Sequence, residues 1–164
     1  MSPSLNGTNI FTTGRITTPA DTPGMQGVTV SRTIDADPGA VESAMADREA
    51  FTRAAGFDEV EVSGDEIRVL NRVGLAEIEL ELAVYEDPDA AFAYEQRDGI
   101  FEAMTTTFTL EEADGGTEVR ARTEFELDVP LVGELLDGTV IKRQRTAELE
   151  AQLDYLEAET QSTT

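Results

Sequence analysis

Six short runs of alternating apolar and polar residues between residues 59 and 128 constrain the fold of this chain most strongly. In the clearest run, Ile78, Leu80 and Leu82 alternate with glutamates, and turn-forming residues such as Gly64-Asp65 separate neighbouring runs. A period of two residues is typical of a strand with one buried and one solvated face, as in antiparallel sheets. The sequence therefore predicts an antiparallel meander with strands at residues 59–63, 67–73, 76–85, 91–97, 103–111 and 118–128.

A further strand and two short helices are predicted before this meander. Val28, Val30 and Ile34 alternate with polar residues and indicate a strand over residues 28–34. Asp37 followed by Pro38 is typical of a helix N-cap and the first helical position. The apolar residues expected to be buried by the two helices, the second of which ends at Gly56, are Val41, Ala44, Met45, Phe51, Ala54 and Ala55.

A long helix is predicted at the C-terminal end. Pro130 closes the sheet region, residues 131–136 suggest a short helical segment, and Gly138 is expected to break it. The helix that follows, of about 20 residues, carries a stripe of leucines. These are Leu149, Leu153 and Leu156.

One domain is expected, because 164 residues match the size of a single domain of roughly 150 residues. Residues 1–26 are rich in Ser, Thr, Gly and Pro without a sustained period. We interpret them as a disordered leader, or as sequence upstream of a start at Met25. The domain is placed at residues 27–160, and residues 161–164 are expected to form a disordered tail.

The charge of the chain restricts its partners. Twelve basic and 34 acidic residues give a net charge of −22, which repels nucleic acids and anionic membrane surfaces. Eleven of the basic residues are Arg, and Lys142 is the one lysine. An acidic, lysine-poor composition resembles cytoplasmic proteins of salt-accumulating halophiles, and a haloarchaeal source is our hypothesis. The alternative is an acidic protein of ordinary cells that binds a basic partner.

Several classes of chemistry are excluded by composition. The chain has no Cys and no His, which removes disulfides, thiolate catalysis, Cys-ligated metals and Ser–His or Cys–His dyads. No phosphate-binding loop, dinucleotide-binding motif or calcium-binding loop is present. The sequence therefore predicts no cofactor, no metal site and no identifiable catalytic residue. No segment is apolar enough for a membrane span, and we expect a soluble, cytoplasmic protein without integral membrane insertion.

The order of strand, two short helices, six strands and one long helix resembles the START-like superfamily, also called SRPBCC. The segments VSRTIDADPGAVESAMAD (residues 30–47) and FTRAAGFDEVEV (residues 51–62), together with the helix from Thr139, carry this resemblance. It implies an α+β helix-grip fold, in which a curved antiparallel sheet of about seven strands grips the C-terminal helix. It also implies a cavity between sheet and helix for a hydrophobic or amphipathic ligand.

The C-terminal helix carries the first candidates for residues that line such a cavity. Thr146, Lys142 and Thr139 precede the leucines at intervals of three and four residues, so the stripe becomes polar in its middle. A polar interruption of an apolar stripe favours a ligand-filled space over packed side chains. In the alternative arrangement the helix is slightly rotated, so that Ile141 and Val140 face inward and Lys142 extends to water.

Three further candidates lie on predicted strands. Arg32 shares the face of Val28 and Val30, and Asn71 interrupts an apolar face in the same way. Either side chain could orient a polar group of a ligand, or could simply be solvated. Tyr94 shares a face with aromatic Phe92 and could contact a ligand or belong to the core.

Three functions remain open at this point. The first is a binder or carrier of a small hydrophobic molecule such as a lipid, isoprenoid or quinone. The second is an enzyme of the polyketide cyclase/dehydratase type, which needs an ionisable group with a perturbed pKa in the cavity. The third is an interaction module that resembles co-chaperone or respiratory-assembly members and acts on a protein partner. A void of about 300 Å³ or more would favour the first two.

Overall fold

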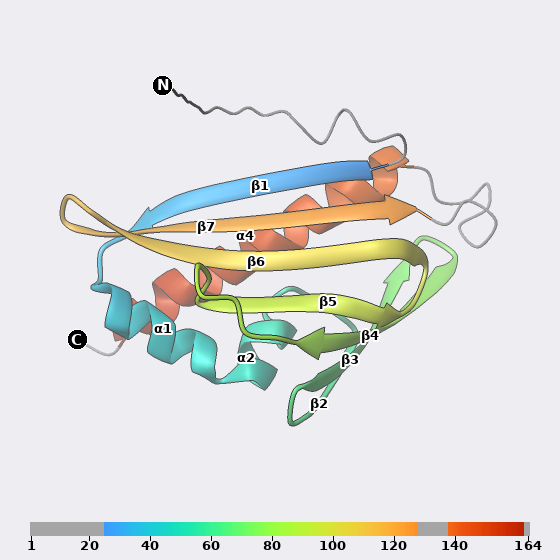
Figure 1. The fold of residues 1–164 in the computed structure, drawn as a ribbon, viewed down its shortest axis with the longest axis horizontal. Helices are drawn as coiled ribbons and strands as arrows, with labels where there is room; N and C mark the ends of the chain where they lie inside the picture. Colours follow the sequence, from blue (N-terminus) through green and yellow to red (C-terminus); the bar gives the residue numbers. More distant parts are fainter. Residues whose placement is uncertain (1–24, 128–137, 163–164) are drawn as a thin grey trace, which may run out of the picture.

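The computed structural model describes residues 25–127 and 138–162, and these form a seven-stranded antiparallel sheet wrapped around one long helix (Figure 1). The strands and helices are β1 (Met25–Ile34), α1 (Pro38–Ala46), α2 (Arg48–Arg53), β2 (Glu59–Ser63), β3 (Glu66–Val73), β4 (Ala76–Val84), β5 (Phe92–Asp98), β6 (Phe101–Ala113), β7 (Gly116–Leu127) and α4 (Gly138–Ser162). The predicted α+β helix-grip fold is confirmed.

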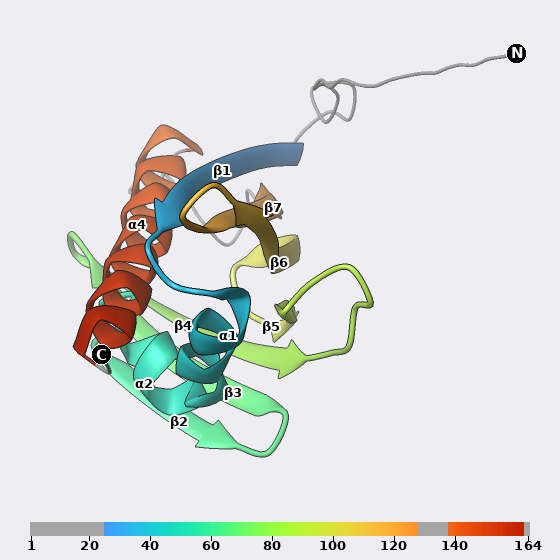
Figure 2. The same cartoon turned by 90° about the vertical axis from the view of Figure 1, so that its left-hand side faces the viewer.

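The strands follow the order β1-β7-β6-β5-β4-β3-β2, so only β1 departs from the simple meander. β1 pairs with β7 over its whole length, from Met25 opposite Glu126 to Ile34 opposite Thr117. The register shifts within β4 and at the start of β6, and such irregularities bend a sheet. In the end view the sheet curls, and α4 closes its open side with α1 and α2 beside it (Figure 2).

The predicted boundaries agree closely with these elements, with a few differences. β1 begins at Met25, three residues before the predicted strand, so residues 25–26 of the predicted leader belong to the sheet. Likewise α4 extends through residues 161–162 of the predicted tail, and β6 and β7 meet in a tighter hairpin than expected. The helix α4 has 25 residues where about 20 were expected. The predicted helix at residues 131–136, the leader up to residue 24 and the last two residues of the predicted tail lie outside the described residues.

The predicted signal for the start of α1 acts as expected, and the structure adds a close approach between β1 and β7. The Asp37 side chain accepts a hydrogen bond from the Ala40 backbone N–H, and Pro38 occupies the first turn of α1. Gly116 starts β7 where the chain passes β1, and a Cβ atom there would lie 2.0 Å from the carbonyl oxygen of Ile34. Glycine is therefore required at this close approach.

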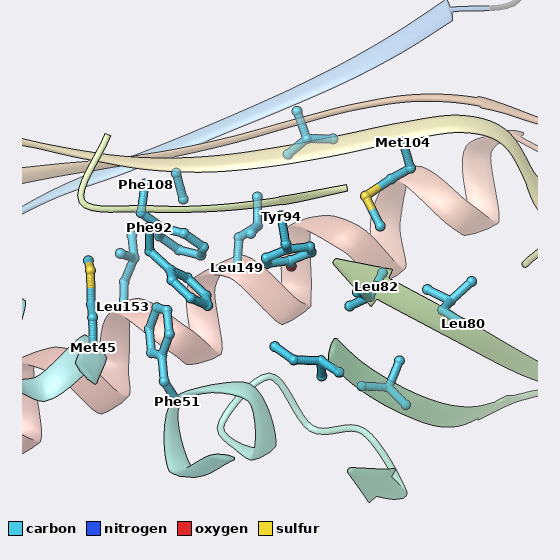
Figure 3. Close-up of a cluster of buried hydrophobic side chains, with 14 of the residues drawn as sticks. Met45, Phe51, Leu80, Leu82, Phe92, Tyr94, Met104, Phe108, Leu149 and Leu153 are labelled. Carbon is cyan, nitrogen blue, oxygen red and sulfur yellow. The ribbon is translucent and has the colours of Figure 1, made fainter. Parts of the chain in front are cut away.

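The core fills the space between the sheet and the three helices. An aromatic cluster occupies the end near α2, with the rings of Phe51 and Phe108 4.9 Å apart and those of Phe51 and Phe92 5.6 Å apart (Figure 3). The leucines Leu149, Leu153 and Leu156 of α4 are fully buried. The predicted leucine stripe thus holds α4 against the rest of the fold.

Replacing Leu149 by Ala should lower the free energy of unfolding by about 2–5 kcal/mol, because it removes buried methyl groups and leaves a cavity. Leu75→Ala is the matched control. Leu75 is 94% exposed in the turn between β3 and β4, and a change there should stay within about 0.5 kcal/mol. Chemical denaturation of both variants in high salt measures this, and equal losses would contradict the described position of α4.

Candidate functional site

A buried ion pair on α4 is the centre of the candidate site. Arg145 donates from Nη1 to the carboxylate of Glu148 one helical turn later, and both side chains are only 4% exposed. Among the described ion pairs every other one has an exposed or half-buried partner. Burying charge is costly without full compensation. The stability of this pair therefore depends on the groups that hydrogen-bond it.

Side chains from three strands and from α4 itself form further hydrogen bonds with the pair. Nη2 of Arg145 donates to the hydroxyls of Thr106 at 2.9 Å and Thr123 at 3.1 Å. Glu148 Oε2 accepts from Asn71 Nδ2 and from Gln144 Nε2, both at 3.2 Å. We call these six residues the polar network. It joins α4 to β3, β6 and β7.

One nitrogen atom of the polar network makes no hydrogen bond. Nε of Arg145 is buried and has no hydrogen-bond partner among the described residues. A buried N–H without a partner carries a desolvation penalty of roughly 1–3 kcal/mol, more when the group is charged. An unsatisfied group of this kind in a native fold calls for an explanation by a water, an ion or a ligand.

A small cavity lies beside the polar network. Arg145, Glu148, Asn71 and Gln144 line it together with apolar side chains, and its volume is about 20 Å³. The apolar side chains are Phe57, Val69, Ile78, Leu80, Phe101 and Ile141. This volume holds about one water molecule. The expected large cavity is therefore not open in this structure, because the side chains of α4 and the sheet fill most of it.

The protonation of the ion pair follows from its surroundings. Burial acts to lower the pKa of Arg145, but Glu148 and the phenol of Tyr94 oppose burial and raise it above its ordinary value. Burial raises the pKa of Glu148, and Arg145 and Gln144 offset this only in part. Arg145 can only donate hydrogen bonds and stays cationic, so at neutral pH we assign the pair as guanidinium and carboxylate.

The structure brings two of the predicted site residues to this site. Asn71 is buried and bonds Glu148. Tyr94 is buried, packs edge-on against Phe92 and directs its hydroxyl towards α4 (Figure 3). Arg32 instead lies near the other end of α4, where it pairs with Asp154 and Glu157 and is partly exposed.

The predicted inward stripe of Thr139, Lys142 and Thr146 is corrected. Thr139 and Lys142 are exposed, and half-buried Thr146 donates to the carbonyl oxygen of Lys142 at 2.8 Å. Ile141 is buried, as in the alternative with a rotated helix. The prediction continued the leucine stripe in a straight line along the helix. In the structure the buried face of α4 shifts around the helix axis towards the N-terminal end.

Sequence reasoning missed Arg145 and Glu148. A signal was available in the spacing of Ile141, Arg145, Glu148 and Gln152, which follow one another by fours and threes. Gln152 is buried as well, and its Nε2 donates to the carbonyl oxygen of Phe51 at 3.0 Å. Charged residues on a helix are usually solvated, so this spacing by itself does not distinguish a buried ion pair from a solvated one.

Comparison with known proteins places the chain in a family. Residues 25–161 match the family described as polyketide cyclase / dehydrase and lipid transport. The chain belongs to this family. Its members share the START-like fold and bind hydrophobic ligands. No curated protein matches the sequence significantly.

Solved structures show the same fold at low sequence identity. TTHA0849 from Thermus thermophilus is 20% identical with a TM-score of 0.67, over 85% of this chain and 99% of that one. A START superfamily protein from Mycobacterium smegmatis is 17% identical with a TM-score of 0.63, over 85% and 99%. The Zhui aromatase/cyclase from Streptomyces is 18% identical with a TM-score of 0.62, over 81% and 94%.

The described residues were also compared with the requirements of a membrane-spanning helix and of a metal site. They contain no helix that is both long and apolar enough to cross a membrane. Over the same ranges, no three acidic side chains gather where they could hold a metal ion.

Removing one member of the ion pair should be costly, whereas removing both should be tolerated. Arg145→Met or Glu148→Leu alone should each lower the free energy of unfolding by about 3–5 kcal/mol, because the remaining charge is buried without a partner. The double variant should recover most of this loss. A double-mutant cycle measured by chemical denaturation gives the coupling energy between the two positions.

The exposed pair of Glu49 and Arg53 on α2 is the matched control, with side chains 56% and 53% exposed. Its coupling energy should be no more than about 0.5 kcal/mol. A similarly small value for Arg145 and Glu148 would show that the pair is not buried as described.

Proposed function

We propose that this protein binds or carries a small hydrophobic or amphipathic molecule, such as a lipid, isoprenoid or quinone, between the sheet and α4. Membership of a family whose members bind hydrophobic ligands supports this proposal. The observation that carries it is the buried Arg145–Glu148 pair, in which Arg145 Nε has no partner among the described residues, beside a cavity lined mostly by apolar side chains.

The pair is hard to explain by stability alone. Replacing a buried ion pair by apolar residues is often neutral or stabilising, and the neighbouring side chains Val69, Ile78 and Leu80 offer apolar surroundings. A polar group at the base of an apolar pocket instead fixes the orientation of a ligand. We therefore assign the pair to ligand binding.

Binding requires the cavity to widen, because about 20 Å³ accommodates only a water molecule. The C-terminal half of α4 is tied down by Arg32 to Asp154, by Gln152 to the Phe51 carbonyl oxygen and by Gln161 to the Asp35 carbonyl oxygen. In the N-terminal half, Arg145 and Glu148 contact the sheet at the cavity itself. A ligand that enters at the cavity would separate the N-terminal half of α4 from β3 and β4. Its first polar contact would be with the polar network.

Two alternatives are each favoured by one observation. An enzyme of the polyketide cyclase/dehydratase type would use Glu148 for proton transfer, since an acid with a raised pKa beside a cavity is suited to that role. An interaction module that acts on a protein partner would have a filled interior, as observed here. An enzyme alters the bound compound, a carrier returns it unchanged, and the interaction module retains no ligand.

Native mass spectrometry of the protein purified in high salt should detect a co-purified hydrophobic molecule. Ile78→Phe should reduce the bound fraction at least tenfold, because the larger ring occupies the cavity. Leu75→Phe makes a comparable change at an exposed position and should retain the ligand. A protein free of ligand in every preparation would favour the interaction module.

We also propose that the acidic surface suits a cytoplasm with molar salt, as in haloarchaea. Its support is the distribution of charge: Glu77 and Glu79 point to solvent along β4, and the net charge of −22 is spread over the domain. Salt at 1 M screens charges beyond ~3 Å and relieves their repulsion.

The melting temperature should therefore rise steadily between 0.1 M and 3 M KCl. Measurement by differential scanning fluorimetry or circular dichroism tests this directly. A melting temperature that stays constant over this range would contradict adaptation to salt and would favour an acidic protein with a basic partner.

A further inference from the structure

The charge balance at the cavity restricts which chemical class of ligand it accepts. Arg145 and Glu148 are the two charged side chains that line it, and they neutralise each other. The polar side chains Asn71 and Gln144 already donate to Glu148. A ligand that enters therefore meets walls with no net charge.

The hydrogen-bonding capacity that remains is also defined. Nη1 of Arg145 is used by Glu148, and Nη2 is used by Thr106 and Thr123, whereas Nε has no partner among the described residues. The phenol of Tyr94 faces the same guanidinium. The site can thus offer the Nε–H, besides the second hydrogen of Nη1, from a group whose charge is already compensated, to an acceptor on the ligand.

An anionic acceptor is unfavourable at this position. A carboxylate would add a second negative charge beside Glu148, and a buried charge without its own counter-ion is strongly disfavoured. A carbonyl, ether or hydroxyl oxygen is neutral and can accept the hydrogen bond of Nε–H without adding charge. A ligand without any acceptor would leave Nε–H unsatisfied.

We infer that the cavity selects neutral molecules with an acceptor oxygen, such as a ketone or quinone carbonyl, and discriminates against carboxylates of the same shape, with Arg145 Nε as the donor. This inference rests on the proposed binding function and specifies its ligand class. Fatty acids and other carboxylates would be poor ligands, despite the hydrophobic walls.

Three probes with the same rigid ring system separate the contributions. These are 2-acetylnaphthalene with a neutral carbonyl, 2-naphthoate with a carboxylate of nearly the same shape, and naphthalene with no acceptor. Calorimetry with the full-length protein in 2 M KCl should show 2-acetylnaphthalene binding at least tenfold more tightly than either other probe. Screening by salt has little effect on a buried pair, so the preference should persist at this concentration.

Two variants at the polar network test the physical cause. Glu148→Gln leaves the guanidinium charge uncompensated and should reverse the preference, so that 2-naphthoate binds more tightly and raises the melting temperature of the variant. Arg145→Met removes the donor and should make 2-acetylnaphthalene and naphthalene bind equally. Glu49→Gln, which removes an exposed glutamate from the pair with Arg53, should keep the preference of the original protein.

The outcomes distinguish this inference from the proposed function. If none of the three probes binds, the proposed function is wrong, and the inference fails with it. If the probes bind with equal affinity, or if 2-naphthoate is preferred by the unaltered protein, the binding function stands and the inference is overturned. The measurement on the unaltered protein decides this even if a variant fails to fold.

Discussion

The hydrogen bonds of Arg145 and Glu148 determine how the N-terminal half of α4 sits on the sheet. Thr106 and Thr123 come from β6 and β7, and Asn71 comes from β3. Because each charge loses its compensation if the helix rotates or slides, the pair fixes one arrangement where apolar contacts alone would allow several.

Charged side chains are stabilised differently at the surface and in the interior of the molecule. Glutamates such as Glu77 and Glu79 point to solvent, where salt screens their repulsion. Inside, Glu148 is matched by one arginine and by amide donors from Asn71 and Gln144. The surface charge is therefore separate from the balanced pair, which is the charge that a ligand in the cavity would meet.

Much of the fold was predictable because its signals are local. Alternation places Ile78, Leu80 and Leu82 on one face of β4 whatever the rest of the chain does, and the Asp37 cap starts α1 from its own side chain. The inward face of α4 depends on the curved sheet opposite it. Between Leu149 and its N-terminal end, the buried face of α4 shifts around the helix to Arg145 and Ile141. A stripe continued in a straight line through Thr146 and Lys142 therefore runs along the exposed side. Arg145 and Glu148 were missed because only their partners on the sheet distinguish a buried ion pair from a solvated one.

The central claim is that Arg145 Nε donates a hydrogen bond to a neutral acceptor on a bound ligand. The most direct measurement is the ¹⁵N–¹H resonance of the Arg145 Nε–H group in 2 M KCl, assigned by its loss in Arg145→Met, during titration with 2-acetylnaphthalene. We predict that the proton resonance shifts downfield and that its exchange with water slows, whereas naphthalene causes no such shift. A resonance that does not respond to the ketone while the ketone binds would contradict the claim.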